Sequence, residues 1–274
     1  MAETRRTEES VSIAYGIEGS GPVVVFLHGI GGNRLNWTGQ LAHFGRRFCA
    51  VAWDARGYLD SDDSPQTLRF SDFADDLCRL LDRLKAEQAH LVGLSMGGMI
   101  IQDFYGRYAD RVATLSLVDT SSGFGGVPEA VRQDFLARRL DPLENGLTPA
   151  DIAPEVVKVL VAESAGQEVR QRLIASMSAL RTEAYKQALH AIITTDFRAV
   201  LPQIAVPTLV IVGEEDQVTP PSASEFLVKQ IPGAALVTIP DCGHLSNLEK
   251  PDLFNAALSK FLDEHARRAS TVTS

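Results

Sequence analysis

The stretch HLVGLSMGGMIIQDFYGRY, residues 90–108, decides the fold. Its opening HLVGL predicts a strand and its end predicts a helix, and the pentapeptide GLSMG (93–97) joins them as G-x-S-x-G. At such a turn the serine oxygen projects above the sheet, at a helix N-terminus whose dipole favours a developing negative charge. A glycine-rich turn that merely contains serine would not account for both flanks. Ser95 is therefore the candidate nucleophile.

Short apolar runs on both sides of this stretch alternate with segments of helical period. This alternation predicts an α/β fold, and the near-continuous apolar character of the runs predicts mostly parallel strands covered on both faces. The polar tail after the last helical segment, residues 265–274, is expected to fray. The predicted strands are residues 22–29, 48–54, 90–94, 112–119, 207–213 and 235–241.

One long segment, residues 121–203, breaks the alternation. It contains no convincing strand but several amphipathic helical stretches, such as 128–140 and 168–180. A helical block between two parallel strands predicts a cap over the carboxyl ends of the strands, where open α/β sheets bind ligands. We therefore expect a core of residues 1–120 and 204–274 with a helical cap at 121–203.

A serine nucleophile needs a base, and His244 is the best placed of the six histidines. It follows the final predicted strand, in a loop that can reach a serine on a central strand. A carboxylate should orient its imidazole, and Asp216 after the penultimate strand completes the chain order Ser, Asp, His. Asp119, at the end of an earlier strand, is a competitor, and so are the neighbouring Glu214 and Glu215.

Acyl transfer also needs donors for a tetrahedral oxyanion. The backbone N–H of Met96, directly after the nucleophile, should supply one, and the glycine-rich loop at 28–32 should supply the other. Ile30 is the expected donor in that loop, with Gly31 as the alternative. The loop lacks the glycine spacing of a dinucleotide or P-loop phosphate site, so phosphate binding is disfavoured.

Composition narrows the classes of partner and compartment. The 274 residues carry a net charge of −9, which disfavours nucleic-acid and membrane-surface partners. The charged N-terminus lacks the apolar stretch of a signal peptide, and three cysteines make no disulfide framework, so a cytoplasmic protein is expected. Cys242 lies close to His244, but it would need its own base and oxyanion donors to act as a nucleophile. The pattern predicts no metal and no cofactor, and it leaves a homo-oligomer open.

With these residues assembled, the chain resembles the α/β-hydrolase superfamily along nearly its whole length. The similarity is greatest to a bacterial group that contains 3-oxoadipate enol-lactonases, related esterases, cofactor-free perhydrolases and C–C hydrolases. It implies an eight-stranded, mostly parallel sheet, a helical lid and a metal-free site. The matching stretches are residues 26–37, 53–58, 93–100, 213–221 and 243–251.

The resemblance also assigns roles to particular residues. It implies Ser95 as nucleophile, His244 as base, Asp216 as acid, and Ile30 and Met96 as oxyanion donors.

Two aromatic residues are candidates for binding the substrate. Trp37 matches an aromatic that often lines the acyl pocket in this family, although a core position suits it equally well. Phe124 is expected to contribute to the pocket from the cap.

Three departures from the family pattern bear on the exact activity. Enol-lactonases commonly carry Asn-Ser where this chain has His28-Gly29, and ring-cleavage C–C hydrolases usually have an aromatic where it has Leu245. Leu59 replaces the second glycine of the RGxGxS turn.

From the candidate residues and the resemblance together, we expect a serine hydrolase that cleaves a small carboxylic ester or lactone through an acyl-enzyme. The alternatives are a C–C hydrolase of a diketone or dienoate, and a slow-turnover receptor that retains the triad.

Overall fold

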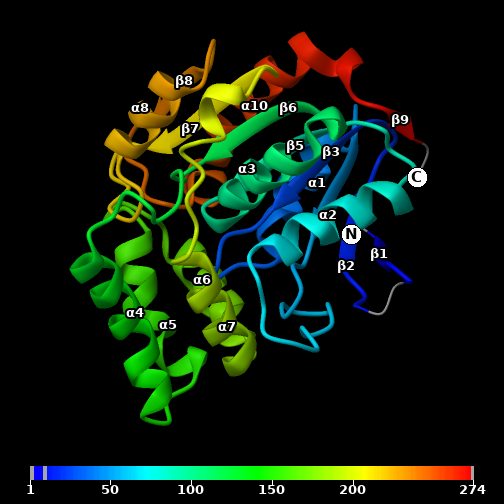
Figure 1. The fold of residues 1–274 in the computed structure, drawn as a ribbon. Coiled ribbons are helices and arrows are strands. Elements are labelled where there is room, and N and C mark those ends of the chain that lie inside the picture. The colour runs from blue at the N-terminus through cyan, green and yellow to red at the C-terminus, as the bar shows by residue number, and fades with distance from the viewer. Residues whose placement is uncertain (1–2, 9–10, 273–274) are drawn as a thin grey trace.

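The computed structural model describes residues 3–8 and 11–272, and its strands form one sheet surrounded by helices (Figure 1). Each of the six predicted strands is present, with ends that differ from the prediction by at most two residues. Three more strands, β1, β2 and β9, come from segments near the two ends of the chain. The strands are β1 Glu3–Arg6, β2 Ala14–Glu18, β3 Gly21–Leu27, β4 Cys49–Trp53, β5 Ala89–Leu94, β6 Val112–Val118, β7 Thr208–Gly213, β8 Ala235–Ile239 and β9 Thr271–Val272.

The strand order β1-β2-β4-β3-β5-β6-β7-β8 places β5 inside the sheet, between β3 and β6. All pairs from β4 to β8 are parallel, whereas β1 and β2 are antiparallel to their neighbours. Every residue of β4, β5, β6 and β7 is buried, so both faces of this part of the sheet are covered. The prediction of a mostly parallel, eight-stranded sheet is confirmed, with β9 added beside β3.

Helices cover the sheet in packed pairs: α2 packs on α3, and α1 packs on α10. Among the described residues, no helix combines the length and apolar character needed to span a membrane. The helices are α1 Thr38–Phe44, α2 Ser71–Arg83, α3 Met96–Tyr108, α4 Glu129–Glu144, α5 Pro149–Leu160, α6 Gln167–Ser178, α7 Thr182–Ile192, α8 Pro221–Gln230, α9 Ser246–Glu249 and α10 Pro251–His265.

Helices α4 to α7 all lie between β6 and β7 in the chain, within residues 121–203, which we call the cap. Figure 1 shows these green to olive helices gathered at one end of the sheet. The two ends of the segment meet, because Gly123 forms a bridge with Asp196 and the Phe124 N–H donates to the Thr195 carbonyl at 2.7 Å. The chain thus enters the cap and leaves it through two neighbouring segments that are hydrogen-bonded to each other.

The C-terminal tail is ordered up to residue 272, so the prediction that it frays is wrong for residues 265–272. The Ser270 carbonyl accepts a hydrogen bond from the Val23 N–H at 3.0 Å, and the Ser270 N–H donates to the Gln88 carbonyl at 2.9 Å. A polar segment can be held in this way by backbone pairing, which composition does not reveal. Residues 273–274 lie outside the described part.

Candidate active site

Ser95 occupies a strained turn between β5 and α3. Its φ of 54° lies in the left-handed region, which disfavours residues with a side chain. The turn is held from both sides, since the Ser95 N–H donates to the Val118 carbonyl at 2.9 Å and the Thr120 hydroxyl donates to the Ser95 carbonyl at 2.7 Å. A Cβ at Gly97 would overlap the Leu27 carbonyl, so glycine is required there for the helix to approach β3.

Ser95, His244 and Asp216 form a continuous chain of hydrogen bonds. The Ser95 Oγ lies 2.9 Å from His244 Nε2, and His244 Nδ1 lies 2.8 Å from Asp216 Oδ2. His244 is on the loop between β8 and α9, and Asp216 follows β7, so three separate strand ends contribute. All three side chains are buried, and Ser95 is 9% exposed. This is the arrangement in which an imidazole can take the serine proton while a carboxylate orients its other nitrogen.

The surroundings of Asp216 stabilise its charged form. Its Oδ1 accepts the N–H groups of Val218 and Thr219, at 2.8 and 3.0 Å, and its Oδ2 accepts the Thr219 hydroxyl at 2.8 Å. Burial opposes ionisation, but the charge of His244 and these hydrogen bonds hold the pKa of Asp216 below its usual range. The competing Glu214 and Glu215 are exposed.

His244 has a pKa above the ordinary histidine value. Burial favours the neutral imidazole, but the charge of Asp216 and the hydrogen bond to it outweigh burial, with Asp119 and Glu249 adding to the effect. A base with a raised pKa accepts the serine proton readily once it is neutral.

Asp119, the competing acid, lies at the end of β6 and makes no hydrogen bond to His244 among the contacts of the described residues. Its Oδ1 accepts the Gly213 N–H at 3.0 Å, and its Oδ2 accepts the N–H and the hydroxyl of Ser246, at 3.0 and 2.7 Å. Burial, together with the charge of Asp216, raises the pKa of Asp119 to about 7. Asp119 therefore fastens neighbouring loops, while Asp216 contacts the imidazole.

The two expected oxyanion donors come from the residue after Ser95 and from the loop after β3. Met96 is the first residue of α3, where a backbone N–H has no partner within the helix. A Cβ at Gly29 would lie 3.1 Å from the Ser95 Cβ, so Gly29, the residue before Ile30, packs closely against the serine. Within residues 3–8 and 11–272, neither the Ile30 nor the Met96 N–H donates a hydrogen bond. An oxyanion donor lacks a partner in this way before a substrate binds.

Sequence reasoning did not identify two side chains that hold the Ile30 loop. His28 Nδ1 donates to the Gly29 carbonyl at 2.8 Å, and its Nε2 accepts the Ala55 N–H at 3.0 Å. Burial lowers the pKa of His28 to about 4, which keeps this ring neutral, and the two hydrogen bonds fix the proton on Nδ1. The Tyr58 hydroxyl donates to the Ile30 carbonyl at 3.0 Å. The HGIGG stretch drew attention to His28, but only tertiary contacts reveal what its ring binds.

Trp37 and Phe124, the two expected substrate contacts, occupy different surroundings. Trp37 is 1% exposed and its ring packs against Phe26 and Phe254, with centroids 5.1 and 6.0 Å away. This placement matches the core alternative for Trp37. Phe124 is half-buried near the start of the cap, where its ring packs on Phe135 at 4.9 Å.

Cys242, the other nucleophile weighed from the sequence, is fully buried. Burial and the charge of Asp119 raise the pKa of its thiol, and its Sγ faces the Gly243 carbonyl at 3.7 Å. A buried thiol with a raised pKa is a poor nucleophile. Of the two candidate nucleophiles, Ser95 is the one that forms a hydrogen bond with His244.

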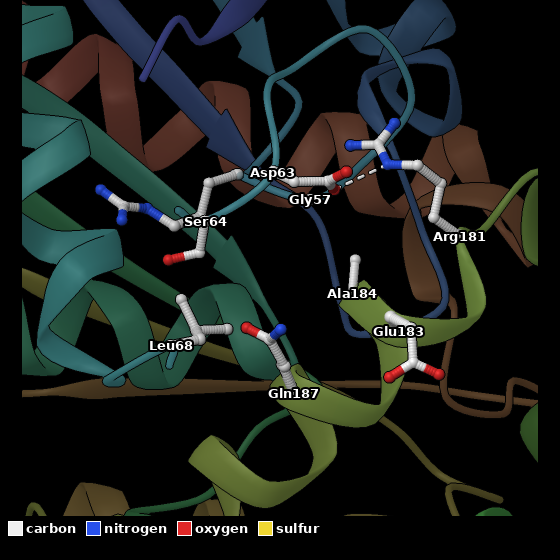
Figure 2. Close-up of a pocket in the computed structure, with 9 residues that line it drawn as sticks. Gly57, Asp63, Ser64, Leu68, Arg181, Glu183, Ala184 and Gln187 are labelled. Atoms are coloured by element: carbon white, nitrogen blue, oxygen red, sulfur yellow. Dashed lines mark hydrogen bonds and ion pairs between the residues drawn. The ribbon is translucent and has the colours of Figure 1, made fainter. Parts of the chain in front are cut away.

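A cavity of about 170 Å³ lies where α7 of the cap meets the loop after β4 (Figure 2). Figure 2 shows Ala184 and Gln187 of α7 facing Ser64 and Leu68 across it. Its cations are already paired: Arg181 with Asp63 at 2.7 Å, and Arg56 with Asp76 at 2.6 Å. None of Ser95, Asp216 and His244 lines this cavity.

Leu59, the departure from the RGxGxS turn, has a φ of 36°. Glycine adopts this left-handed conformation freely, whereas a residue with a side chain pays roughly 1 kcal/mol. The backbone thus keeps the glycine conformation despite the substitution. Arg181 of the cap donates to the Leu59 carbonyl at 2.9 Å, which helps to hold the turn.

The comparisons with known proteins identify the family and its fold. The family model described as alpha/beta hydrolase fold matches residues 22–251. The chain belongs to this α/β-hydrolase family. A crystal structure of a hydrolase from Pseudomonas aeruginosa is 31% identical, with a TM-score of 0.85 over 95% of this chain and 98% of that one.

Two further relatives are named for ester or lactone chemistry. A thermophilic esterase from Thermogutta terrifontis is 29% identical, with a TM-score of 0.86 over 96% of this hydrolase and 100% of that chain. A 3-oxoadipate enol-lactonase from Acinetobacter baylyi is 29% identical over 92% of this chain and 93% of its own length. The predicted family and the predicted enzyme class, a hydrolase, are confirmed.

Proposed function

We propose that this hydrolase cleaves a small carboxylic ester or lactone through an acyl-enzyme formed on Ser95. The observation that carries the proposal is the unbroken chain of hydrogen bonds from the Ser95 hydroxyl through His244 to Asp216. Relatives named as an esterase and as an enol-lactonase support the substrate class. The enclosed position of Ser95 favours a small substrate.

In the proposed reaction, Ser95 Oγ attacks the acyl carbon while His244 Nε2 takes the hydroxyl proton. The carbonyl oxygen becomes an oxyanion and accepts the N–H groups of Ile30 and Met96. His244 then gives its proton to the departing alkoxide as the C–O bond breaks, which leaves the acyl group on Ser95. A water molecule, deprotonated by His244, releases the acid and restores the serine. Asp216 stabilises the imidazolium at both stages.

The remaining expectations stay predictions. They are a cytoplasmic location, activity without metal or cofactor, no nucleic-acid or membrane partner, an open oligomeric state, and the division into a core and a cap. Phe124 is proposed to contact the acyl chain from the cap, since it is half-buried and packs on another cap aromatic.

The decisive test compares Ser95→Ala with Cys242→Ala. We expect Ser95→Ala to lose about 10⁴- to 10⁶-fold in kcat, because the nucleophile is gone, while Cys242→Ala keeps near-normal turnover. A fluorophosphonate probe followed by intact mass should label the wild type and the cysteine variant but not Ser95→Ala. Labelling of Ser95→Ala would contradict the assignment.

A substrate screen separates the proposed activity from its alternatives. Esters, lactones and vinylogous diketones should be assayed in parallel, with esters or lactones turned over at ~1–10³ s⁻¹. Preferred cleavage of a diketone would favour a C–C hydrolase. A single slow turnover on every substrate would favour a receptor that retains the triad.

A further inference from the structure

The cap touches the loop that carries His244 without any side chain between the two backbones. A Cβ placed on Gly243 would lie 2.6 Å from the Ala162 nitrogen and 2.8 Å from the Leu160 carbonyl oxygen. Real side chains do not approach backbone atoms this closely, so the contact requires glycine at position 243. The end of α5 and the residues after it, Leu160–Ala162, therefore rest directly on the histidine loop.

Hydrogen bonds join the two segments at the catalytic histidine itself. The His244 N–H donates to the Leu160 carbonyl at 2.7 Å. Because this carbonyl ends a cap helix, its partial negative charge suits an N–H donor. The backbone of His244 is thus fixed by a cap residue rather than by the sheet.

The Glu249 carboxylate, at the end of α9, binds both sides of this contact. Its Oε2 accepts the Ala162 N–H from the cap at 2.9 Å and the Gly243 N–H from the loop at 3.1 Å. Its Oε1 accepts the Leu245 N–H at 3.1 Å. One carboxylate therefore holds the residues immediately before and after His244 and ties them to the cap. Charged acceptors make stronger hydrogen bonds than neutral ones.

We propose that Glu249 is a positioning residue that holds the His244 loop against the Leu160–Ala162 segment of the cap. The position of the cap on the core therefore determines the position of the His244 imidazole. This inference rests on the proposed function, in which His244 is the base. It gives the cap a part in the chemical step as well as in substrate choice. A small displacement of the imidazole from Ser95 would slow proton transfer, since misplacement by about 1 Å can cost ~100-fold.

Glu249 also contributes charge at the imidazole. The carboxylates that act on His244 are Asp216 from the loop after β7, Asp119 from the end of β6, and Glu249 from α9, and each raises the pKa of His244. Loss of the Glu249 charge should therefore lower that pKa. In a plot of kcat/KM against pH, the fall on the acid side reports protonation of His244. This acid limb should move to lower pH.

The test compares Glu249→Ala and Glu249→Gln with a matched control on α8, Glu225→Ala, which removes an exposed carboxylate. With p-nitrophenyl acetate as substrate, we expect Glu249→Ala to lose about 10- to 100-fold in kcat with little change in KM. Glu249→Gln should recover part of that loss, because its amide oxygen still accepts N–H donors. Both Glu249 variants should shift the acid limb to lower pH, and the control should resemble the wild type.

A second variant probes the cap side of the contact. Gly243→Ala should force Leu160–Ala162 away from the loop and lower both kcat and the rate of fluorophosphonate labelling at Ser95. Thermal unfolding of each variant shows whether it is folded at the assay temperature. If Glu249→Ala does not fold, the test uses Glu249→Gln, whose side chain has nearly the same shape. The pH of the acid limb of its kcat/KM profile is then compared with that of the wild type.

Unchanged kcat and acid limb in the Glu249 variants would overturn the inference. So would a loss of Tm with an unmoved acid limb, which would mark Glu249 as purely structural. These outcomes differ from a failure of the proposed function, in which the wild type itself would not be labelled at Ser95.

Discussion

The ends of two neighbouring strands, β6 and β7, each present a buried aspartate, yet the two carboxylates have different partners. Asp216, after β7, binds the His244 imidazole and the Thr219 hydroxyl through one oxygen. Asp119, after β6, binds the backbone of Gly213 and both donors of Ser246. Their pKa values also move apart, since that of Asp216 is lowered and that of Asp119 is raised to about 7.

Burial does not explain this difference, because both side chains are buried. The hydrogen-bond partners differ. Asp216 bonds to His244, which can carry a positive charge, whereas Asp119 bonds to neutral donors, so burial and the charge of Asp216 outweigh the opposing charge of His244 on Asp119. The partner of a buried carboxylate, rather than its depth, therefore separates an orienting acid from a structural one.

The largest effect is expected from Asp216→Asn. An asparagine amide can present its oxygen or its N–H₂ to His244, and either arrangement fails to stabilise the imidazolium that forms when Ser95 attacks. We expect a loss of as much as ~10⁴ in kcat with the fold intact. Steady-state kinetics and circular dichroism on the same sample check both parts. A loss below ten-fold would remove Asp216 from the triad.

A smaller effect is expected from Asp119→Asn, about 10-fold in kcat, because one of its loop contacts must be lost. The pH profile of this variant is more informative than its kcat. The negative charge of Asp119 raises the pKa of His244, so its removal should move the acid limb of kcat/KM to lower pH. In the wild type the same limb should lie above the ordinary histidine pKa. If Asp119→Asn costs more activity than Asp216→Asn, the two roles are reversed.

The smallest effect is expected from Thr219→Val, which removes the hydroxyl that donates to Asp216 Oδ2 and keeps the shape of the side chain. A neutral hydrogen bond of this kind contributes about 1 kcal/mol, so kcat should fall roughly 2- to 10-fold. The matched control is Thr182→Val, at the first residue of α7 in the cap. Equal activity in Thr219→Val and the wild type would show that the backbone N–H groups alone orient Asp216.

Much of the fold could be predicted because its signals are local. Six strands appear as continuous apolar runs, and the Ser95 turn is marked by its glycines and by the strand and helix on either side. The strands β1 and β2 escaped prediction because β1 is short and charged, and both are held by antiparallel pairing beside the parallel part of the sheet. The segment with β9 escaped because its hydrogen bonds to Val23 and Gln88 join positions distant in the chain.

The sequence by itself selected the candidate nucleophile, the candidate base and a short choice of acids, because each is marked by residue type and by its place after a strand. Only the tertiary structure decided which aspartate meets His244, since two strand ends compete and side-chain direction depends on how their loops are held. It also decided that the cap rests on the histidine loop. The Leu160, Gly243 and Glu249 contacts join segments far apart in sequence, and no local pattern encodes a distance between them.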